Sequence, residues 1–160
     1  MKLTECPEMP EIPDPVKASL DCGLAYLKGS GPWVPPGGWP CDREFAEVVL
    51  ATMEAWAADH WGGAARIVHL GIHAYRNVRS AGGRTGKRLS NHAYGRAIDW
   101  AGVWLNGKRL DPYKLEDNAP TKFADLRARL RRAAKAAGAR LEWLTYRGVG
   151  TWLHVGLHPR

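Results

Sequence analysis

The sequence has few cysteines and no long apolar run. Only 3 of its 160 residues are cysteine, at Cys6, Cys22 and Cys41, and none of them forms a CxxC pair. This odd number without that spacing provides neither a closed disulfide framework nor a cysteine zinc knuckle, so we expect free thiols or a single disulfide. No window reaches the ~18 apolar residues of a membrane span. No basic segment followed by an apolar core begins the chain, so we expect cytoplasmic synthesis without a secretory signal.

Basic residues outnumber acidic residues, and the sequence has no internal repeat or low-complexity tract. The 23 Lys and Arg residues exceed the 16 Asp and Glu residues, which gives a formal net charge of +7. This excess favours a polyanionic partner such as nucleic acid, anionic lipid or an anionic cell-wall polymer. No nucleic-acid motif accompanies it, so we expect neither nucleic acid nor membrane as a partner. The densest basic run, residues 126–140, is also typical of the solvated face of a helix.

The length of the chain suits one compact domain. Residues 1–41 are rich in proline and glycine, and we interpret them as an extension that wraps the core. Within the extension, the apolar spacing of residues 16–29 could form a helix closed by Gly29. Residues 42–160 would then form the domain proper.

Helix and strand patterns are mixed in residues 42–160. Helices are expected over 43–61, with Asp42 as the N-cap, and over 121–137, ended by Gly138. Strands are expected over 65–75, 95–105, 139–146 and 151–158, with a polar loop at 76–90 and a turn at Asn106-Gly107. Without regular βαβ alternation, the fold class is α+β, with a small antiparallel sheet and flanking helices.

Asp99 is an acid inside a strand pattern. Alternation puts Ala97, Ala101 and Val103 on its face of the strand, and Ile98 and Trp100 on the other. A buried carboxylate among small apolar side chains needs a cation or a hydrogen-bond network.

Two histidines could bind a cation together with Asp99 or form hydrogen bonds with it. His92 lies on the loop that enters the strand, and Gly95 allows this loop to fold back sharply. His154 lies on a later strand and could complete a His, Asp, His set, which provides three zinc ligands and leaves the fourth position for water. The alternative is that both histidines only satisfy hydrogen bonds of the core.

The segment SNHAYGRAID, residues 90–99, resembles the SxHxxGxAxD motif of zinc D-alanyl-D-alanine carboxypeptidases and related peptidoglycan endopeptidases. Residues 69–110 are most similar to the extensin-like C-terminal domain, a branch of that group. The resemblance covers residues 66–110 well and 120–158 loosely, and residues 1–41 match nothing in it. It implies a zinc D-Ala-D-Ala peptidase-like fold and a monomeric enzyme that hydrolyses peptidoglycan stem peptides, of the kind found in phage endolysins.

The resemblance also implies roles for single residues. His92, Asp99 and His154 would bind Zn²⁺, and Ser90 would shape the ligand loop beside the substrate.

Arginines and aromatic residues would contact the substrate. Arg76 would hold a substrate carboxylate or stabilise the developing oxyanion, and Arg79 is a second candidate; either could instead be a solvated loop charge. Tyr146 and Trp152 could pack against sugar rings, although aromatic side chains also dominate cores.

One departure from the family concerns the general base. The family carries an acid or a histidine two or three residues before the last zinc histidine, and this chain has Thr151 and Trp152 there. Neither accepts a proton near pH 7. Glu142 on the preceding strand could replace the base, and His73 or His158 are further candidates.

Without a base, the protein would be a non-catalytic, zinc-stabilised structural or wall-binding module of a phage particle. The sequence therefore predicts action at the cell wall after phage-type release, or a place in a phage particle.

Overall fold

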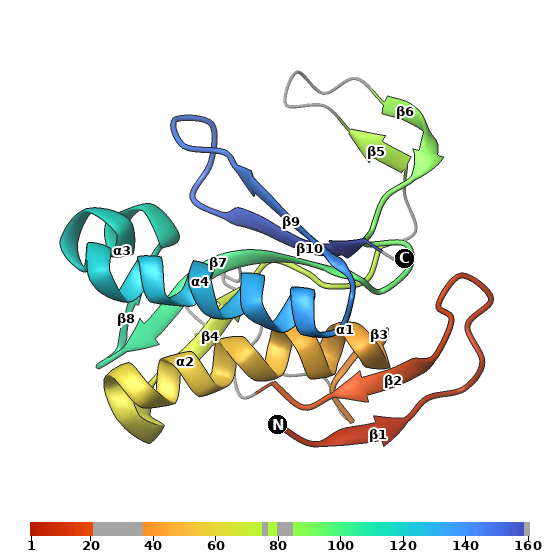
Figure 1. Ribbon diagram of the computed structural model, residues 1–160, viewed down its shortest axis with the longest axis horizontal. Helices are drawn as coiled ribbons and strands as arrows, with labels where there is room; N and C mark the ends of the chain where they lie inside the picture. The colour runs from red at the N-terminus through yellow and green to blue at the C-terminus, as the bar shows by residue number, and fades with distance from the viewer. Residues whose placement is uncertain (21–36, 75–76, 80–84, 159–160) are drawn as a thin grey trace.

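A five-stranded antiparallel sheet carries two long helical segments on one face (Figure 1). This computed structural model describes residues 1–20, 37–74, 77–79 and 85–158. The strand order is β4-β7-β10-β9, and β8 pairs with β7. The strands are β4 (Arg66–His69), β7 (Ala97–Leu105), β8 (Lys108–Leu110), β9 (Arg140–Thr145) and β10 (Leu153–His158). The predicted α+β class with an antiparallel sheet is confirmed.

The predicted first helix spans the expected residues in three continuous parts. These are α1 (Arg43–Phe45), a π-helical turn (Ala46–Leu50) and α2 (Ala51–Trp61), followed by a 3₁₀ turn (Gly62–Ala64). The side chain of Asp42 accepts a hydrogen bond from the backbone N–H of Phe45 at 3.4 Å, so it is the predicted N-cap.

The second predicted helix is α4 (Pro120–Ala136), and Gly138 follows it with a φ of 65°. A shorter helix, α3 (Pro112–Asn118), was not expected. Its signals were in the sequence, because Asp111 caps the backbone N–H groups of Tyr113 and Lys114 at 3.0 Å and Pro112 occupies the first turn.

The main core fills the space between the helices and one face of the sheet. The helical segments bury residues at helical spacing, namely Phe45, Val49, Met53, Trp56, Phe123, Leu126 and Leu130. The sheet contributes alternate residues of its central strands, namely Ile98, Trp100, Leu153, Val155 and Leu157. Each such side chain stabilises the fold by ~1.5–3 kcal/mol when it is fully buried. The other residues of β7 and β10 therefore point away from the helices.

A bulge in β7 changes the alternation that the sequence predicted. Val68 pairs with Gly102 but His69 pairs with Trp100, so Ala101 is the extra residue. Beyond it, Val103 packs in the main core with Ile98 and Trp100 rather than on the face of Asp99. The predicted position of Val103 is wrong because the alternation assumed a regular strand.

The N-terminal residues form a second antiparallel sheet, with β1 (Leu3–Glu5), β2 (Pro15–Ala18) and β3 (Trp39–Asp42) in that order. The helix expected from residue 16 is wrong at its start, because Val16 and Ala18 alternate as buried residues of β2. The rest of that predicted helix, with Cys22 and Gly29, lies outside the described residues. Val16 and Cys41 belong to the main core, so this sheet packs against the domain.

Two further expectations are corrected. The strand predicted over 65–75 ends at His69, after the bulge. Beyond it, the backbone N–H of Leu70 donates to Asp99 O at 2.8 Å and that of Asp99 donates to Gly71 O at 3.0 Å, but no further residue belongs to β4. The predicted loop at 76–90 contains the hairpin strands β5 (Asn77–Arg79) and β6 (Thr85–Leu89). Most of β6 is exposed and polar, so the sequence has no apolar alternation there that would predict a strand. Among the described helices, none has the length and apolar character needed to cross a membrane.

Candidate metal centre

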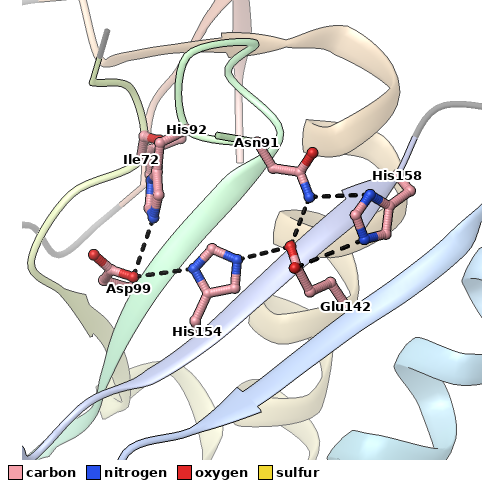
Figure 2. A network of polar contacts seen from close by, with 7 residues as sticks. All are labelled: Ile72, Asn91, His92, Asp99, Glu142, His154 and His158. Atoms are coloured by element: carbon pink, nitrogen blue, oxygen red, sulfur yellow. Dashed lines mark hydrogen bonds and ion pairs between the residues drawn. The ribbon is translucent and has the colours of Figure 1, made fainter. Parts of the chain in front are cut away.

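The sheet brings the predicted acid and the later histidine together. β7 and β10 are antiparallel, and Asp99 lies directly opposite His154 in their register. On the next strand Glu142 lies opposite Gly156. All three side chains are on the face away from α2 and α4, where they form one polar network (Figure 2).

His92 reaches this face from the turn that precedes β7. The backbone N–H of Ala93 donates to Ser90 O at 3.0 Å, and that of Gly95 donates to His92 O at 3.1 Å. Gly95 has a φ of 64°, and a Cβ there would lie 2.8 Å from the backbone nitrogen of Asp42. The predicted sharp turn at Gly95 is confirmed, because only glycine fits this conformation and this approach.

The three predicted ligands converge on Asp99. His92 Nε2 lies 3.1 Å from Asp99 Oδ1, and His154 Nδ1 lies 3.3 Å from the same oxygen. One ligand atom of each residue lies within 4.8 Å of the others. A tetrahedral zinc site with bonds near 2.0–2.1 Å has ligand atoms about 3.3 Å apart. The group could therefore bind a metal ion, and two imidazoles with one carboxylate suit Zn²⁺.

The far nitrogen of each histidine is held by a fixed partner. His92 Nδ1 donates to the backbone carbonyl of Ile72 at 2.8 Å, and His154 Nε2 donates to Glu142 Oε2 at 3.0 Å. A carbonyl only accepts hydrogen bonds, so the proton of neutral His92 resides on Nδ1 and Nε2 keeps its lone pair. Partners of this kind fix the ring orientation and the tautomer of metal-binding histidines. Both rings thus present the nitrogen that faces Asp99.

The charges of this network depend on one another. Burial alone would raise the pKa of Asp99, but its interactions with the His154 and His92 rings hold it below its usual range. Burial opposes the charge on His154, yet the hydrogen bonds to Asp99 and Glu142 raise its pKa to about 9. The hydrogen bond from His154 lowers the pKa of Glu142 to about 2. Without a metal, His154 is therefore an imidazolium between two carboxylates at neutral pH.

Glu142 is held on the outer side of His154. Asn91 Nδ2 donates to Glu142 Oε2 at 2.6 Å and also lies 3.4 Å from His158 Nδ1. His158 Nε2 lies 3.7 Å from the other oxygen of Glu142 (Figure 2). No pattern in the sequence indicated a role for Asn91, although it lies next to His92 within the motif.

A further buried histidine was also missed. His69 is fully buried, and neither of its ring nitrogens has a hydrogen-bond partner within the described part of the chain. Burial lowers its pKa to about 3, against the attraction of Asp99, so the ring is neutral. It packs edge-on against Trp39 at 4.5 Å between ring centroids. No motif indicated His69, because its role arises from packing between distant segments.

The other predicted site residues lie in different places. Tyr146 and Trp152 stack on each other, with 5.4 Å between ring centroids, where β9 and β10 are connected. The hydroxyl of Tyr113 joins both ends of that connection, because it donates to Trp152 O and accepts from the backbone N–H of Tyr146. Ser90 is buried, and its hydroxyl has no partner among the residues that the structure describes.

The structure describes the remaining candidate bases, but it describes the candidate arginines only in part. His73 Nε2 lies 3.3 Å from Glu11 Oε1, apart from the three ligands. Thr151 is exposed, and its hydroxyl accepts from the guanidinium of Arg109 at 3.4 Å. The backbone of Arg79 belongs to β5, whereas its side chain and the whole of Arg76 lie outside the described residues.

Comparison with protein-family profiles, with curated proteins and with solved structures found no match to this chain.

Proposed function

We propose that the protein is a zinc-dependent peptidase that hydrolyses stem peptides of peptidoglycan. The observation that carries the proposal is the arrangement of the two histidines. Each turns one nitrogen toward Asp99 while its other nitrogen is held by a fixed acceptor. A cluster that only satisfied hydrogen bonds of the core would not need two rings preorganised around one carboxylate oxygen.

The donor set supports zinc-assisted hydrolysis as the reaction class, and the resemblance of residues 90–99 supports stem peptides as the substrate class. A bound Zn²⁺ would polarise the scissile carbonyl and lower the pKa of water at its open position to about 7. His92, Asp99 and His154 would hold the ion. Arg76, with Arg79 as the second candidate, would hold the carboxylate of the stem peptide or the developing oxyanion.

The contacts of Glu142 favour a positioning role over that of general base. A base must reach the attacking water, but Glu142 contacts the His154 nitrogen that faces away from Asp99, and Asn91 and His158 surround its carboxylate. In this role Glu142 orients His154 and makes it a stronger ligand. The water would then lose its proton to solvent or to a substrate group.

The test of the proposal is release of peptides from purified peptidoglycan. We expect release by the native protein with Zn²⁺, none after chelation, and recovery when Zn²⁺ is returned. His154→Ala should be inactive. His60→Ala is the matched control, because His60 pairs with Asp125 at 2.8 Å on the helical side of the sheet. Equal release by native protein and His154→Ala would contradict the proposal.

One observation favours a second function, the non-catalytic zinc-stabilised module of a phage particle or wall assembly. Among the residues that the structure describes, Thr151 and Trp152 supply no base before His154, and Glu142 is held on its far side. This function predicts that Zn²⁺ raises the melting temperature while no wall peptide is released. Zinc-dependent release would exclude it.

A further inference from the structure

A basic groove lies on the opposite face of the sheet from the candidate metal centre. It has a volume of about 600 Å³ and lies between the C-terminal half of α4 and β9. Four of its nine lining residues are cationic, and none is acidic. Arg127, Arg131 and Lys135 lie on α4, whereas Arg140 begins β9, and the alternation of the strand puts its side chain on the face of Glu142. We name the four cations, with Trp143, the α4–β9 groove.

The cations of the groove are exposed and have no acidic partner within the described ranges. Arg129 of the same helix behaves differently, because it pairs with Asp125 at 2.9 Å and also with Asp59 on α2. One side of α4 is therefore neutralised internally, while the side toward the groove keeps its charge.

The spacing along α4 builds a row of charge. Arg127, Arg131 and Lys135 are four residues apart, so their Cα atoms are spaced ~6 Å along the helix axis. Like charges at this spacing destabilise an isolated helix. A row of cations without acidic partners among the described residues points to an anionic ligand with repeated charges.

The aromatic residue of the groove indicates which anion is recognised. The guanidinium of Arg127 lies 5.4 Å from the centre of the Trp143 ring, and Phe123 packs against the same ring at 5.7 Å. Trp143 is thus engaged by its own protein, whereas proteins that bind single-stranded nucleic acid offer aromatic faces for bases to stack on. The groove is suited to recognise charge without bases.

We propose that the α4–β9 groove binds a phosphodiester polymer without bases, the polyol phosphate type of bacterial cell walls. The choice of the wall as its source rests on the proposed function. The groove would hold the protein on the wall through phosphate contacts, while stem peptides reach the other face of the sheet. Glu142 and Trp143 are neighbours in β9 and point to opposite faces, so the two sites can be altered separately.

The first test is binding of purified poly(glycerol phosphate) chains to the full protein, at 50 and 200 mM salt. Arg131→Glu should raise the Kd at least about tenfold, because it replaces a phosphate contact by a repulsive charge. Arg132→Glu is the matched control, since Arg132 is the exposed neighbour on the same helix, carries the same charge and does not line the groove. It should change the Kd less than about twofold.

The salt dependence gives a second readout. Three phosphate contacts, one from each cation of α4, predict that log K falls with log salt with a slope of about −2, and Arg131→Glu should make the slope less steep by about one. Lys135→Glu should repeat the result, and circular dichroism should show all variants folded. Equal weakening by Arg131→Glu and Arg132→Glu would overturn the proposal, because binding would then depend only on net charge.

The source of the polymer is tested by competition with single-stranded DNA of equal charge. Tighter binding of DNA that is lost in Arg131→Glu would overturn the wall polymer and assign the groove to nucleic acid. Failure of the proposed function is recognised separately, by zinc content and by peptide release from peptidoglycan stripped of phosphate polymers. Arg131→Glu should change neither, so a loss of polymer binding with unchanged release locates the effect in the groove.

Discussion

The two faces of the central sheet are made from the same strands but have opposite chemistry. The face toward α2 and α4 carries Ile98, Trp100 and Val155, which are fully buried in the main core. The adjacent positions of the same strands, Asp99 and His154, carry ionisable groups on the other face. Burial of apolar area stabilises the first face, whereas the second depends on a complete set of partners. Stability and candidate chemistry are thus separated by the two-residue period of the strand.

The largest expected effect comes from the core face. Trp100→Ala should lower the free energy of unfolding by ~3–5 kcal/mol, because it leaves a cavity where a fully buried ring packs against Trp56 and Phe123. Chemical denaturation measures this loss. The loss in free energy of unfolding should be the same with and without Zn²⁺. A loss that Zn²⁺ abolishes would show that the two faces do not act independently.

The turn that presents His92 should be nearly as sensitive. Gly95→Ala places a side chain at a φ of 64° and against the backbone of Cys41 and Asp42. We expect a loss of stability of ~1–3 kcal/mol together with weaker zinc binding, because the strained turn carries His92. Gly107→Ala is a control with positive φ at an open turn. Equal zinc affinity in both variants would contradict the role of the turn.

On the polar face, Glu142→Gln should act mainly on metal affinity. Loss of the carboxylate behind His154 should weaken zinc binding by ~10–100-fold, measured by competition with a chelator, with a smaller effect on unfolding. Peptide release should return at high Zn²⁺ if Glu142 is a positioning residue. If Glu142 is instead the general base, zinc is retained and release stays absent. Glu116→Gln is a control at a partly exposed carboxylate that pairs with Arg147, and it should change neither quantity.

The last expected effect concerns the pH dependence of stability in the metal-free protein. The pKa of His154 is raised in the folded state to about 9, so its contribution to stability is complete below the unfolded value near 6.5 and is lost as pH rises through about 9. We expect thermal unfolding to show a decrease of roughly 2–3 kcal/mol between pH 7 and 10, because each pKa unit corresponds to ~1.4 kcal/mol. His154→Ala should remove this decrease, and an unchanged decrease in that variant would assign it to other groups.

The sequence predicted features that repeat over short distances. The spacing of apolar residues located α2 and α4, the Asn106-Gly107 turn joined β7 and β8, and the motif around His92 placed two ligands on one turn and strand. In each case the signal and the structure lie within about one element, so local geometry decides the outcome.

Features that depend on contacts between distant segments were not predictable. The bulge at Ala101 arises where β7 meets β4, and the hydrogen bond from His92 to Ile72 O joins residues 20 positions apart. Whether Glu142 faces the open side of His154 or its far side depends on the register between β9 and β10. Strand spacing suggested that Glu142 was near, but only the packed sheet gives its partner atoms.

The proposed hydrolysis and the effects expected on the polar face both depend on a metal ion held by His92, Asp99 and His154. Elemental mass spectrometry of the purified native protein, beside His154→Ala, measures whether this ion is bound. We expect about one zinc per chain in the native protein and loss of zinc in the variant. No metal in the native protein after zinc supplementation, or the same metal content in both proteins, would contradict it.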